Sequence, residues 1–464
     1  MSLRSVAQRF NVSTCVSCNK CFDVCPIHWA DSRFDPSELA AACLDEGPLD
    51  EKALFTLWTC TGCRACLSRC PEAAPDFASF AFEVRSEARR LGHRPPSPYG
   101  GAMEILRRLS ADHRLSGRRS SALPQKWRRP PEEGAALLYL GALPFIADVV
   151  EPELGARAVR SVIAGLELLE ALGVSFGVLD DETDCGHDLI WTGDRLTFKT
   201  HARRLREQIA ASNVKTVIPV NEEAADTLKH EFPSVGYPID AQVVTLSDYL
   251  ARHAGALRFA PSNKKVAVHV ESRRADEEHR LRQLARALEH VPETEVVELP
   301  EAEPMPQTVG VKGFAVCGGW AAALQNRLLA AAEKSGAEAL VLAGVNGVTH
   351  LRCSCRQGAW CRSAMPVLTA AEFLREHLLE GDEEGVAEER GKEGEVEEGD
   401  EEGVAEERGK EGVVEERGEE GAVGEVGEGQ LESGAVVAKE GGGPGGGEET
   451  DVSAVGDDEK ERDE

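Results

Sequence analysis

The sequence predicts a mixed fold, with an α-helical domain at the N-terminus, two consecutive α/β domains and a disordered acidic tail. Three observations lead to this prediction. A cysteine motif occurs twice before residue 72, with helical patterns between and after the copies. Short apolar runs then alternate with amphipathic helical patterns, and the end of the chain is rich in Glu and Gly without any aromatic residue. A chain of 464 residues also exceeds what one hydrophobic core usually organises.

The repeated motif consists of four cysteines followed by a proline. Both copies read C-x2-C-x2-C-x3-C-P, and they comprise Cys15, Cys18, Cys21 and Cys25 in the first motif and Cys60, Cys63, Cys66 and Cys70 in the second motif. This spacing is typical of ferredoxins with two [4Fe-4S] clusters, in which the fourth cysteine of each motif binds the other cluster. The predicted ligand sets are therefore Cys15, Cys18, Cys21 and Cys70 for one cluster, and Cys25, Cys60, Cys63 and Cys66 for the other. A pair of zinc sites is the alternative, but zinc uses four ligands in two pairs and does not need the triple spacing.

Helices are predicted between and after the two motifs. The segment Asp35-Pro36-Ser37-Glu38 has an N-cap acid, a proline suited to the first helical position and a following glutamate, and Gly47 can end the helix. A second helix is predicted over Asp76–Leu91, where apolar residues recur at helical spacing. Cys43 lies inside the first of these helices, and we expect it to be a buried core residue.

Beyond residue 133 the pattern changes to alternating strands and helices. The predicted strands are the apolar runs Ala135–Leu140, Val214–Val220, Lys265–Val270 and Glu338–Ala343. Helical patterns such as Ala156–Leu172 and Leu324–Lys334 lie between them, which favours parallel sheets covered by helices. Neither a G-x-G-x-x-G motif after a strand nor a P-loop is present, so the sequence does not support a nucleotide, nicotinamide or flavin site.

Charge separates the tail and a linker from the predicted domains. From Gly381 to Glu464 the chain has 32 Asp and Glu against 8 Lys and Arg, so this segment carries −24 of the total charge of −29. Such a segment cannot bury enough apolar surface to offset the entropy of ordering, and we expect disorder. From Arg85 to Arg129 there are 12 basic against 3 acidic residues, which indicates a basic linker. Three roles are expected for this linker: a solvated connection, a docking site for the acidic tail, or a surface that steers an acidic partner. Nucleic-acid binding is the least favoured role, because the sequence contains no recognition motif for it.

The location of the protein is expected to be cytoplasmic. The first 11 residues lack the apolar core of a signal peptide, and the longest uncharged stretches are too short to span a bilayer. Membrane contact is therefore expected only through a partner. Fourteen cysteines without an export signal indicate metal ligation or redox chemistry rather than a disulfide framework.

The N-terminal part resembles the heterodisulfide reductase C/D-type iron-sulfur proteins and the iron-sulfur subunits of glycolate oxidase and anaerobic glycerol-3-phosphate dehydrogenase. The resemblance rests on the two motifs, on Phe34-Asp35-Pro36 and on Leu57-Trp58-Thr59-Cys60. It continues through Thr183-Asp184-Cys185-Gly186 and through Val316-Cys317-Gly318-Gly319, which follow the outline of tandem Cys-Cys-Gly domains. Together with the charge pattern, the resemblance leads to a predicted helical ferredoxin domain over 1–92, a basic linker over 93–133, degenerate Cys-Cys-Gly-like α/β domains over 134–252 and 263–379, and the disordered tail over 380–464.

The chain departs from this family at the cysteines of the Cys-Cys-Gly domains. The positions of the missing cysteines fall on Ala142, Asp184 and Asn221–Ala224 in the first domain and on Val316, Gly344 and Gly347 in the second. Because thiolates are the donors an iron-sulfur site requires, the resemblance carries over the fold but not the catalytic cluster. Cys185 and Cys317 are then expected not to be ligands.

One group of cysteines leaves a further metal site open. Cys353, Cys355 and Cys361 lie close together in the sequence, and with Cys317 they would supply four thiolates for zinc or a third cluster. The alternative, which the spacing favours, is a set of ordinary thiols in a connecting segment.

The function expected from these features is electron transfer through two [4Fe-4S] clusters, between a dehydrogenase or reductase and an acceptor. The expected partner is a redox protein, in particular a flavin-containing dehydrogenase or reductase subunit, and the chain is expected to be a subunit of an oxidoreductase complex rather than a stand-alone enzyme. The alternative is a catalytic subunit, heterodisulfide-reductase-like or hydroxy-acid-dehydrogenase-like, that uses a third site at the late cysteines. A non-redox adaptor with structural clusters is a third reading.

Overall fold

A computed structural model describes residues 2–45, 47–71, 76–96, 119–144, 147, 152–270, 277–297, 299, 319–356 and 363–379. The chain divides into two units, Met1–Glu389 and Arg390–Glu464, and every described residue lies in the first unit. The predicted acidic tail over 380–464, residues 97–118 of the predicted linker, Cys317 and Cys361 lie outside the described residues.

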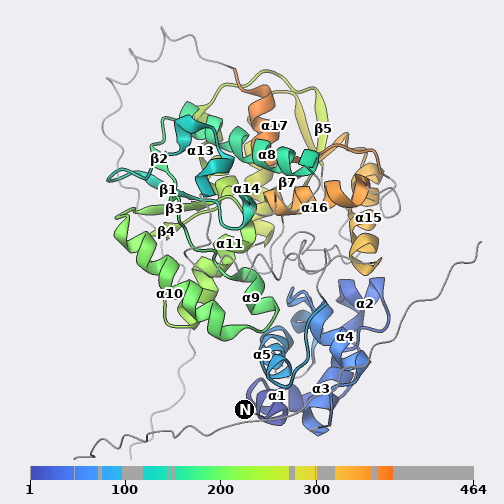
Figure 1. Ribbon diagram of the computed structural model, residues 1–464. Helices are drawn as coiled ribbons and strands as arrows, with labels where there is room; N and C mark the ends of the chain where they lie inside the picture. Colours follow the sequence, from blue (N-terminus) through green and yellow to red (C-terminus); the bar gives the residue numbers. More distant parts are fainter. Residues whose placement is uncertain are drawn as a thin grey trace, which may run out of the picture. The chain divides into compact units, whose positions relative to one another are not determined.

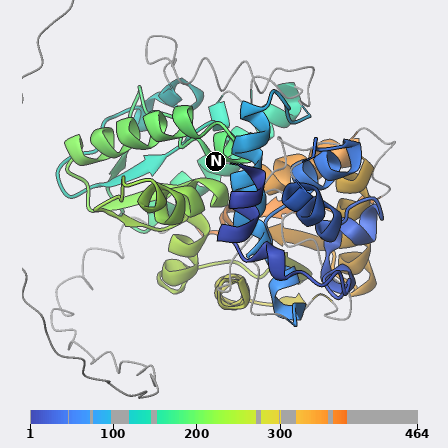
Figure 2. The same ribbon diagram turned by 90° about the horizontal axis from the view of Figure 1, so that it is seen from below.

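The N-terminal segment is helical, as the sequence predicts (Figure 1). Its α-helices are α1 (Leu3–Arg9), α2 (Pro26–Ala30), α3 (Pro36–Asp45), α4 (Glu51–Thr59) and α5 (Phe77–Arg90). Three short 3₁₀ turns complete it, η1 (Val12–Thr14), η2 (Phe22–Val24) and η3 (Ala65–Arg69). Seen from below in Figure 2, these blue helices pack side by side, with α1 against both α3 and α5.

Acidic side chains start the longer helices of this segment. The Asp35 carboxylate accepts hydrogen bonds from the Ser37 and Glu38 backbone N–H groups at 2.9 and 3.2 Å, which confirms the predicted start of α3. Asp50 caps α4 and Asp76 caps α5 in the same way. The predicted helix over Asp76–Leu91 is therefore confirmed within one residue at each end.

The remainder contains two four-stranded sheets with the same topology. The first has the order β2 (Phe176–Gly177), β1 (Ala136–Tyr139), β3 (Thr216–Pro219) and β4 (Gln242–Val243), and the second has the order β6 (Thr294–Val297), β5 (Lys264–His269), β7 (Ala339–Leu342) and β8 (Val367–Thr369). All pairings are parallel. We name the two halves the first and second α/β repeat. All four predicted strands are confirmed, as β1, β3, β5 and β7.

Helices fill the connections of both repeats. The first repeat contains α8 (Pro152–Ala171), α9 (His187–Trp191), α10 (Arg195–Ala211), α11 (Glu222–Asp226), a π-helical turn η7 (Thr227–Glu231), α12 (Phe232–Ser234), α13 (Leu246–His253) and η8 (Ala254–Ala256). The second contains α14 (Glu277–Glu289), α15 (Gly319–Lys334), α16 (Val345–Arg356) and α17 (Ala370–His377). The predicted helices over Ala156–Leu172 and Leu324–Lys334 correspond to α8 and α15.

Both faces of each sheet are buried, as is usual for parallel sheets. In the first repeat, Leu137 and Tyr139 contribute to one apolar cluster with α10, whereas Leu138 contributes to another cluster that also holds residues of the second repeat. In the second repeat, Val266 and Val268 enter that shared cluster, whose members come from both repeats. Alternate residues of β1 and β5 thus serve different cores, since Ala267 of β5 belongs to a third cluster that includes residues of the N-terminal helices.

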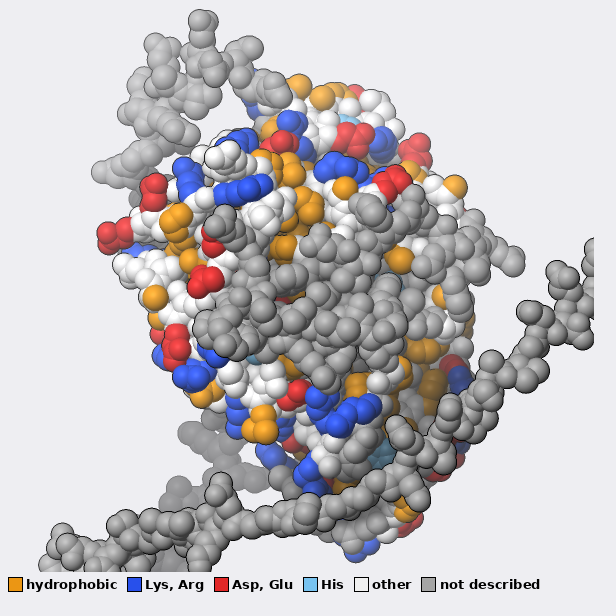
Figure 3. Space-filling model, viewed as in Figure 1, with side chains coloured by type: hydrophobic (Ala, Val, Ile, Leu, Met, Phe, Trp, Pro, Cys, Tyr) orange, Lys and Arg blue, Asp and Glu red, His pale blue; other side chains and the backbone are white. Residues whose placement is uncertain are grey.

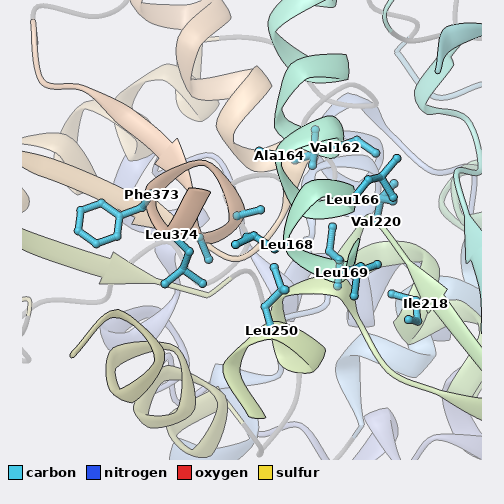
Figure 4. Packing of buried hydrophobic residues seen from close by; sticks show 14 of the residues in the cluster. Val162, Ala164, Leu166, Leu168, Leu169, Ile218, Val220, Leu250, Phe373 and Leu374 are labelled. Atoms are coloured by element: carbon cyan, nitrogen blue, oxygen red, sulfur yellow. The ribbon is translucent and has the colours of Figure 1, made fainter. Parts of the chain in front are cut away.

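The shared cluster joins the two repeats through α8. Val162, Leu166 and Leu169 of α8 lie among Ile218 and Val220 on one side, and α17 of the second repeat supplies Phe373 and Leu374 to the same cluster (Figure 4). Just as α8 of the first repeat packs against α17 of the second, α13 of the first repeat packs against α14 of the second. Each repeat therefore covers part of the other's core.

Part of the predicted basic linker is packed rather than solvated. Residues 119–127 form η5 (Arg119–Ala122) and η6 (Gln125–Trp127), and the Trp127 and Arg119 side chains are buried. The Trp127 indole N–H donates to Glu170 at 2.7 Å, and Arg119 donates to the Gly141 carbonyl oxygen. The prediction of a solvated linker is wrong for these residues, because the Trp127 indole and the Arg119 guanidinium are buried and hydrogen-bonded to the first α/β repeat.

The described surface in Figure 3 shows Lys and Arg interspersed with Asp and Glu. Within the described part of the chain, every helix is too short or too polar to cross a bilayer.

Candidate metal centre

The two cysteine motifs form two loops with the same backbone pattern. In the first motif, Ser17 and Asn19 have φ angles of 51° and 60°, and in the second, Gly62 and Arg64 at the corresponding positions have 67° and 62°. A left-handed residue between successive cysteines turns the chain sharply, which lets neighbouring side chains face a common volume. In each motif the fourth cysteine follows a 3₁₀ turn and precedes the proline.

These loops line two cavities that share cysteines from both motifs. The cavity that we name the inner cavity is lined by the cysteines Cys25, Cys60, Cys63 and Cys66. The second, which we name the outer cavity, is lined by the cysteines Cys15, Cys18, Cys21, Cys66 and Cys70. Each cavity thus combines three cysteines of one motif with the fourth cysteine of the other, and Cys66 lies between them.

The two cavities differ in their exposure to solvent. Cys15 and Cys18 of the outer cavity are exposed, whereas Cys25 and Cys60 of the inner cavity keep only 8% and 7% of their surface in water. Burial raises the pKa of Cys21 to about 11 and raises the pKa of Cys25 further. Without a ligand these two thiols are protonated at neutral pH, so binding of a metal centre to them would release protons.

The donor set suits an iron-sulfur cluster. Four thiolates around one volume are the soft ligands that [4Fe-4S] clusters use. Among the described residues, no three His, Cys, Asp or Glu side chains come close enough together to hold a single metal ion. The cysteines surround volumes rather than converge on a point.

Neighbouring residues fix the loop that leaves the first motif. The His28 ring stacks on Phe22 with 4.0 Å between ring centroids, and its Nδ1 lies 2.8 Å from the Phe34 carbonyl oxygen. The His28 backbone N–H points at the Cys25 sulfur at 3.4 Å. Hydrogen bonds to ligand sulfur are one means by which a protein adjusts a cluster.

A buried arginine next to the inner cavity was not singled out by sequence reasoning. Arg85 of α5 has no exposed surface, and its guanidinium donates to the Cys60 carbonyl oxygen at 2.6 Å and to the Leu57 carbonyl oxygen at 2.7 and 2.9 Å. Its only sequence signal is a basic residue on the apolar face of an amphipathic helix, one position after Val84.

Two of the late cysteines lie in a helix, in contrast to the expectation of a connecting segment. Cys353 and Cys355 lie in the last turn of α16, and Cys355 is in a disulfide. Cys317 and Cys361, the other two members of the possible third site, lie outside the described residues.

Carboxylates and amides occupy the positions where the resemblance would place thiolates. Glu222 and Glu223, just after β3, are buried, and burial raises the pKa of Glu223 to about 8. Asn346 in the first turn of α16 donates from its side chain to Glu223 and from its backbone to the Asn221 side chain, both at 3.2 Å. The corresponding turns of the two repeats therefore meet through polar, non-sulfur groups. Cys185 is buried against Tyr139 in the core of the first repeat.

Comparisons with known proteins agree with the cysteine geometry. Residues 7–71 match a family described as a 4Fe-4S dicluster domain. This chain is an iron-sulfur protein. That match includes all eight cysteines of the two motifs.

Curated relatives of this iron-sulfur protein extend the match. A probable membrane-anchored ferredoxin of Chromohalobacter salexigens is 24% identical over 56% of this chain and 44% of its own length. An EtfAB:quinone oxidoreductase of Syntrophomonas wolfei is 23% identical over 54% of this chain and 41% of its own length. A subunit of the fumarate reductase (CoM/CoB) of Methanothermobacter marburgensis is 24% identical over 55% of this chain and 50% of its own length. The iron-sulfur protein thus spans half or less of the length of these relatives, and they support iron-sulfur electron transfer associated with oxidoreductases.

Among solved structures, a hypothetical protein from Helicobacter pylori is similar, with a TM-score of 0.41 and 12% identity over 68% of this chain and 61% of that one.

Proposed function

We propose that this chain holds two [4Fe-4S] clusters and relays single electrons between a dehydrogenase or reductase and an acceptor. The observation that carries the proposal is the interleaving of the cysteines, since each cavity takes three from one motif and the fourth from the other. The ligands would be Cys25, Cys60, Cys63 and Cys66 in the inner cavity and Cys15, Cys18, Cys21 and Cys70 in the outer cavity. When bound, such clusters accept and release one electron at a time.

The exposed loop of the outer cavity is where electrons would be exchanged with a partner. Cys15 and Cys18 are exposed, and Val16 between them keeps 63% of its surface in water. An apolar, accessible loop beside the ligands allows a partner to approach closely. The inner cavity lies behind buried residues and would exchange electrons through the outer one.

The partner that we propose is a flavin-containing dehydrogenase or reductase subunit. Such subunits divide two-electron chemistry into single electrons, which a cluster can take. Support comes from the names of two relatives, an EtfAB:quinone oxidoreductase and a fumarate reductase subunit. The two α/β repeats, which we assign to degenerate Cys-Cys-Gly-type domains of the heterodisulfide reductase C/D type, would then form the docking body rather than a catalytic centre.

Iron content and electron paramagnetic resonance test the cluster count. Anaerobically purified protein should contain about eight iron and eight sulfide per chain and show two interacting signals on reduction. About four iron, or zinc in their place, would reject the proposal. An iron count well above eight would instead favour the catalytic subunit that uses Cys317, Cys353, Cys355 and Cys361.

A pair of matched variants tests the ligand sets. Cys25 and Cys43 are both buried in the helical segment, but of the two only Cys25 lines the inner or the outer cavity. Cys25→Ala should remove the signal of the inner cluster, whereas Cys43→Ala should keep the full iron content and both signals. An unchanged iron count and spectrum in Cys25→Ala would show that Cys25 is not a ligand.

A further inference from the structure

The inner cavity has a fixed positive charge beside it. Arg85 is fully buried, and an arginine side chain stays protonated in proteins. Three hydrogen bonds hold its guanidinium against the carbonyl oxygens of Leu57 and Cys60, at the point where α4 passes into the second motif. The positive charge of Arg85 therefore lies against the backbone carbonyl group of Cys60, a cysteine that lines the inner cavity.

Aromatic rings hold this guanidinium in place. It lies 5.2 Å from the centroid of the Phe82 ring and 4.8 Å from that of the Trp191 ring. The Trp191 N–H in turn donates to His187 Nε2 at 2.7 Å, which anchors the indole within the first α/β repeat. Both rings also approach Gly62 of the second motif, where a Cβ atom would lie 2.8 Å from Phe82 and 3.1 Å from Trp191. The guanidinium can neither swing into water nor be screened by it.

The described residues that line the outer cavity are uncharged, and the charge that acts on its Cys21 from Asp35 is negative. The inner cavity is also lined by Arg64, but that side chain is 42% exposed and lies 3.5 Å from the Asp76 carboxylate, so its charge is largely neutralised and screened. Arg85 thus places a buried positive charge beside the inner cavity, whereas the described residues that line the outer cavity are uncharged.

A buried positive charge favours the reduced state of a nearby cluster, because reduction adds one negative charge. At an effective dielectric constant of about 20, a unit charge closer than about 12 Å to the added charge changes the corresponding equilibrium by tenfold or more. Burial of the inner cavity works in the opposite direction by disfavouring added charge. The guanidinium offsets this penalty at the inner cavity alone.

We propose that Arg85 is a positioning residue whose fixed charge raises the reduction potential of the inner cluster above that of the outer cluster. This inference rests on the proposed function, which supplies the two clusters. With both clusters bound, an electron given up by a donor at the exposed outer loop would reduce the outer cluster and then pass to the inner cluster. The donor would be left oxidised by one electron, the outer cluster oxidised and the inner cluster, next to Trp191 and the first α/β repeat, reduced.

The order of the potentials is testable without changing Arg85. In a stepwise anaerobic redox titration of the holoprotein, the first resonance to appear should be the one altered by Cys63→Ser, which changes an inner ligand. Cys18→Ser, which changes an outer ligand, should alter the second resonance. If Cys18→Ser alters the first one, the electron settles on the outer cluster and the inference is wrong.

The role of the charge itself is tested by Arg85→Gln and Arg85→Lys. Arg85→Gln should lower the potential of the inner cluster by at least a tenfold change in its redox equilibrium, or about 59 mV for one electron, and leave the outer cluster unchanged. Arg85→Lys keeps the charge and should retain most of the potential. The control is Arg89→Gln, one turn further along α5, whose guanidinium pairs with Asp194 at 2.9 Å.

The outcomes separate the two proposals. Suppose that wild type and Arg85→Gln both contain eight iron and show two resonances, and that the potential of the inner cluster is the same in both. The role of Arg85 would then be overturned, while the two-cluster relay would stand. A wild-type protein without two clusters would overturn the relay itself. If Arg85→Gln does not retain its clusters, the wild-type titration with the two ligand variants still decides the order of the potentials.

Discussion

Arg280 joins the two α/β repeats through a buried ion pair, and its removal has a large expected cost. From α14 of the second repeat its Nε donates to Asp248 on α13 at 3.2 Å, and its Nη2 pairs with Glu222 on α11. The three side chains keep only 10%, 11% and 4% of their surface in water. Burial and the neighbouring Asp248 raise the pKa of Glu222, and Arg280 opposes this rise.

The magnitude follows from what Arg280→Ala leaves behind. Two buried carboxylates would lose their counter-charge, and removal of one partner of a buried ion pair typically costs about 3 to 5 kcal/mol of unfolding free energy. The variant's Glu222 would be protonated in the folded state up to a higher pH than in the unfolded state. The stability defect should therefore be smallest below the unfolded pKa and should grow as the pH rises through the folded pKa.

The assay is urea denaturation of the full chain, followed by circular dichroism at two pH values. The control is Arg203→Ala, because Arg203 and Glu207 form an ion pair on α10 whose side chains are 52% and 58% exposed, and its loss should cost less than about 0.5 kcal/mol. The reasoning is refuted if Arg280→Ala costs less than about 1 kcal/mol or if its defect does not increase with pH.

Two further predictions concern the backbone and a buried histidine. Gly193 has a φ angle of 72°, and a Cβ atom there would lie 2.5 Å from the Arg85 carbonyl oxygen. Gly193→Ala should therefore lower the free energy of unfolding by at least about 1 kcal/mol more than Gly236→Ala, where no atom lies within 4 Å of the added Cβ. His350 is buried beside Gln325, and burial lowers its pKa to about 4. Because the unfolded state binds this proton more readily, about 3 kcal/mol of the free energy of unfolding should be lost as the pH falls from 6.5 through 4. That loss should shrink in His350→Gln, and an unchanged acid transition would show that another group is responsible.

The helical segment and the strands could be predicted because their signals are local. The acid before Pro36 and the apolar spacing after Asp76 fix where α3 and α5 begin, and short buried runs mark β1, β3, β5 and β7. The motif spacing likewise predicts which cysteines face a common volume. Such signals need no knowledge of which other segments lie nearby.

The packed part of the linker and the helical position of Cys353 were predicted incorrectly for a related reason. Trp127 and Arg119 look like members of a basic, proline-containing stretch, and only the folded chain brings them next to their partners, Glu170 of α8 and the Gly141 carbonyl oxygen. The spacing of the late cysteines favoured a connecting segment, whereas Cys353 lies in α16, which packs against α8.

The sequence by itself determined the eight cysteines of two motifs, the helical character of their surroundings and the succession of parallel strands, since all of these follow from spacing and periodicity along the chain. Only the tertiary structure decided which charges lie near which cysteines and how the two repeats bury each other. Arg85 beside Cys60 and Arg280 beside Glu222 are contacts between residues 25 and 58 positions apart. Such contacts depend on which faces of helices and sheets meet, and that choice is made by the packing of the whole fold.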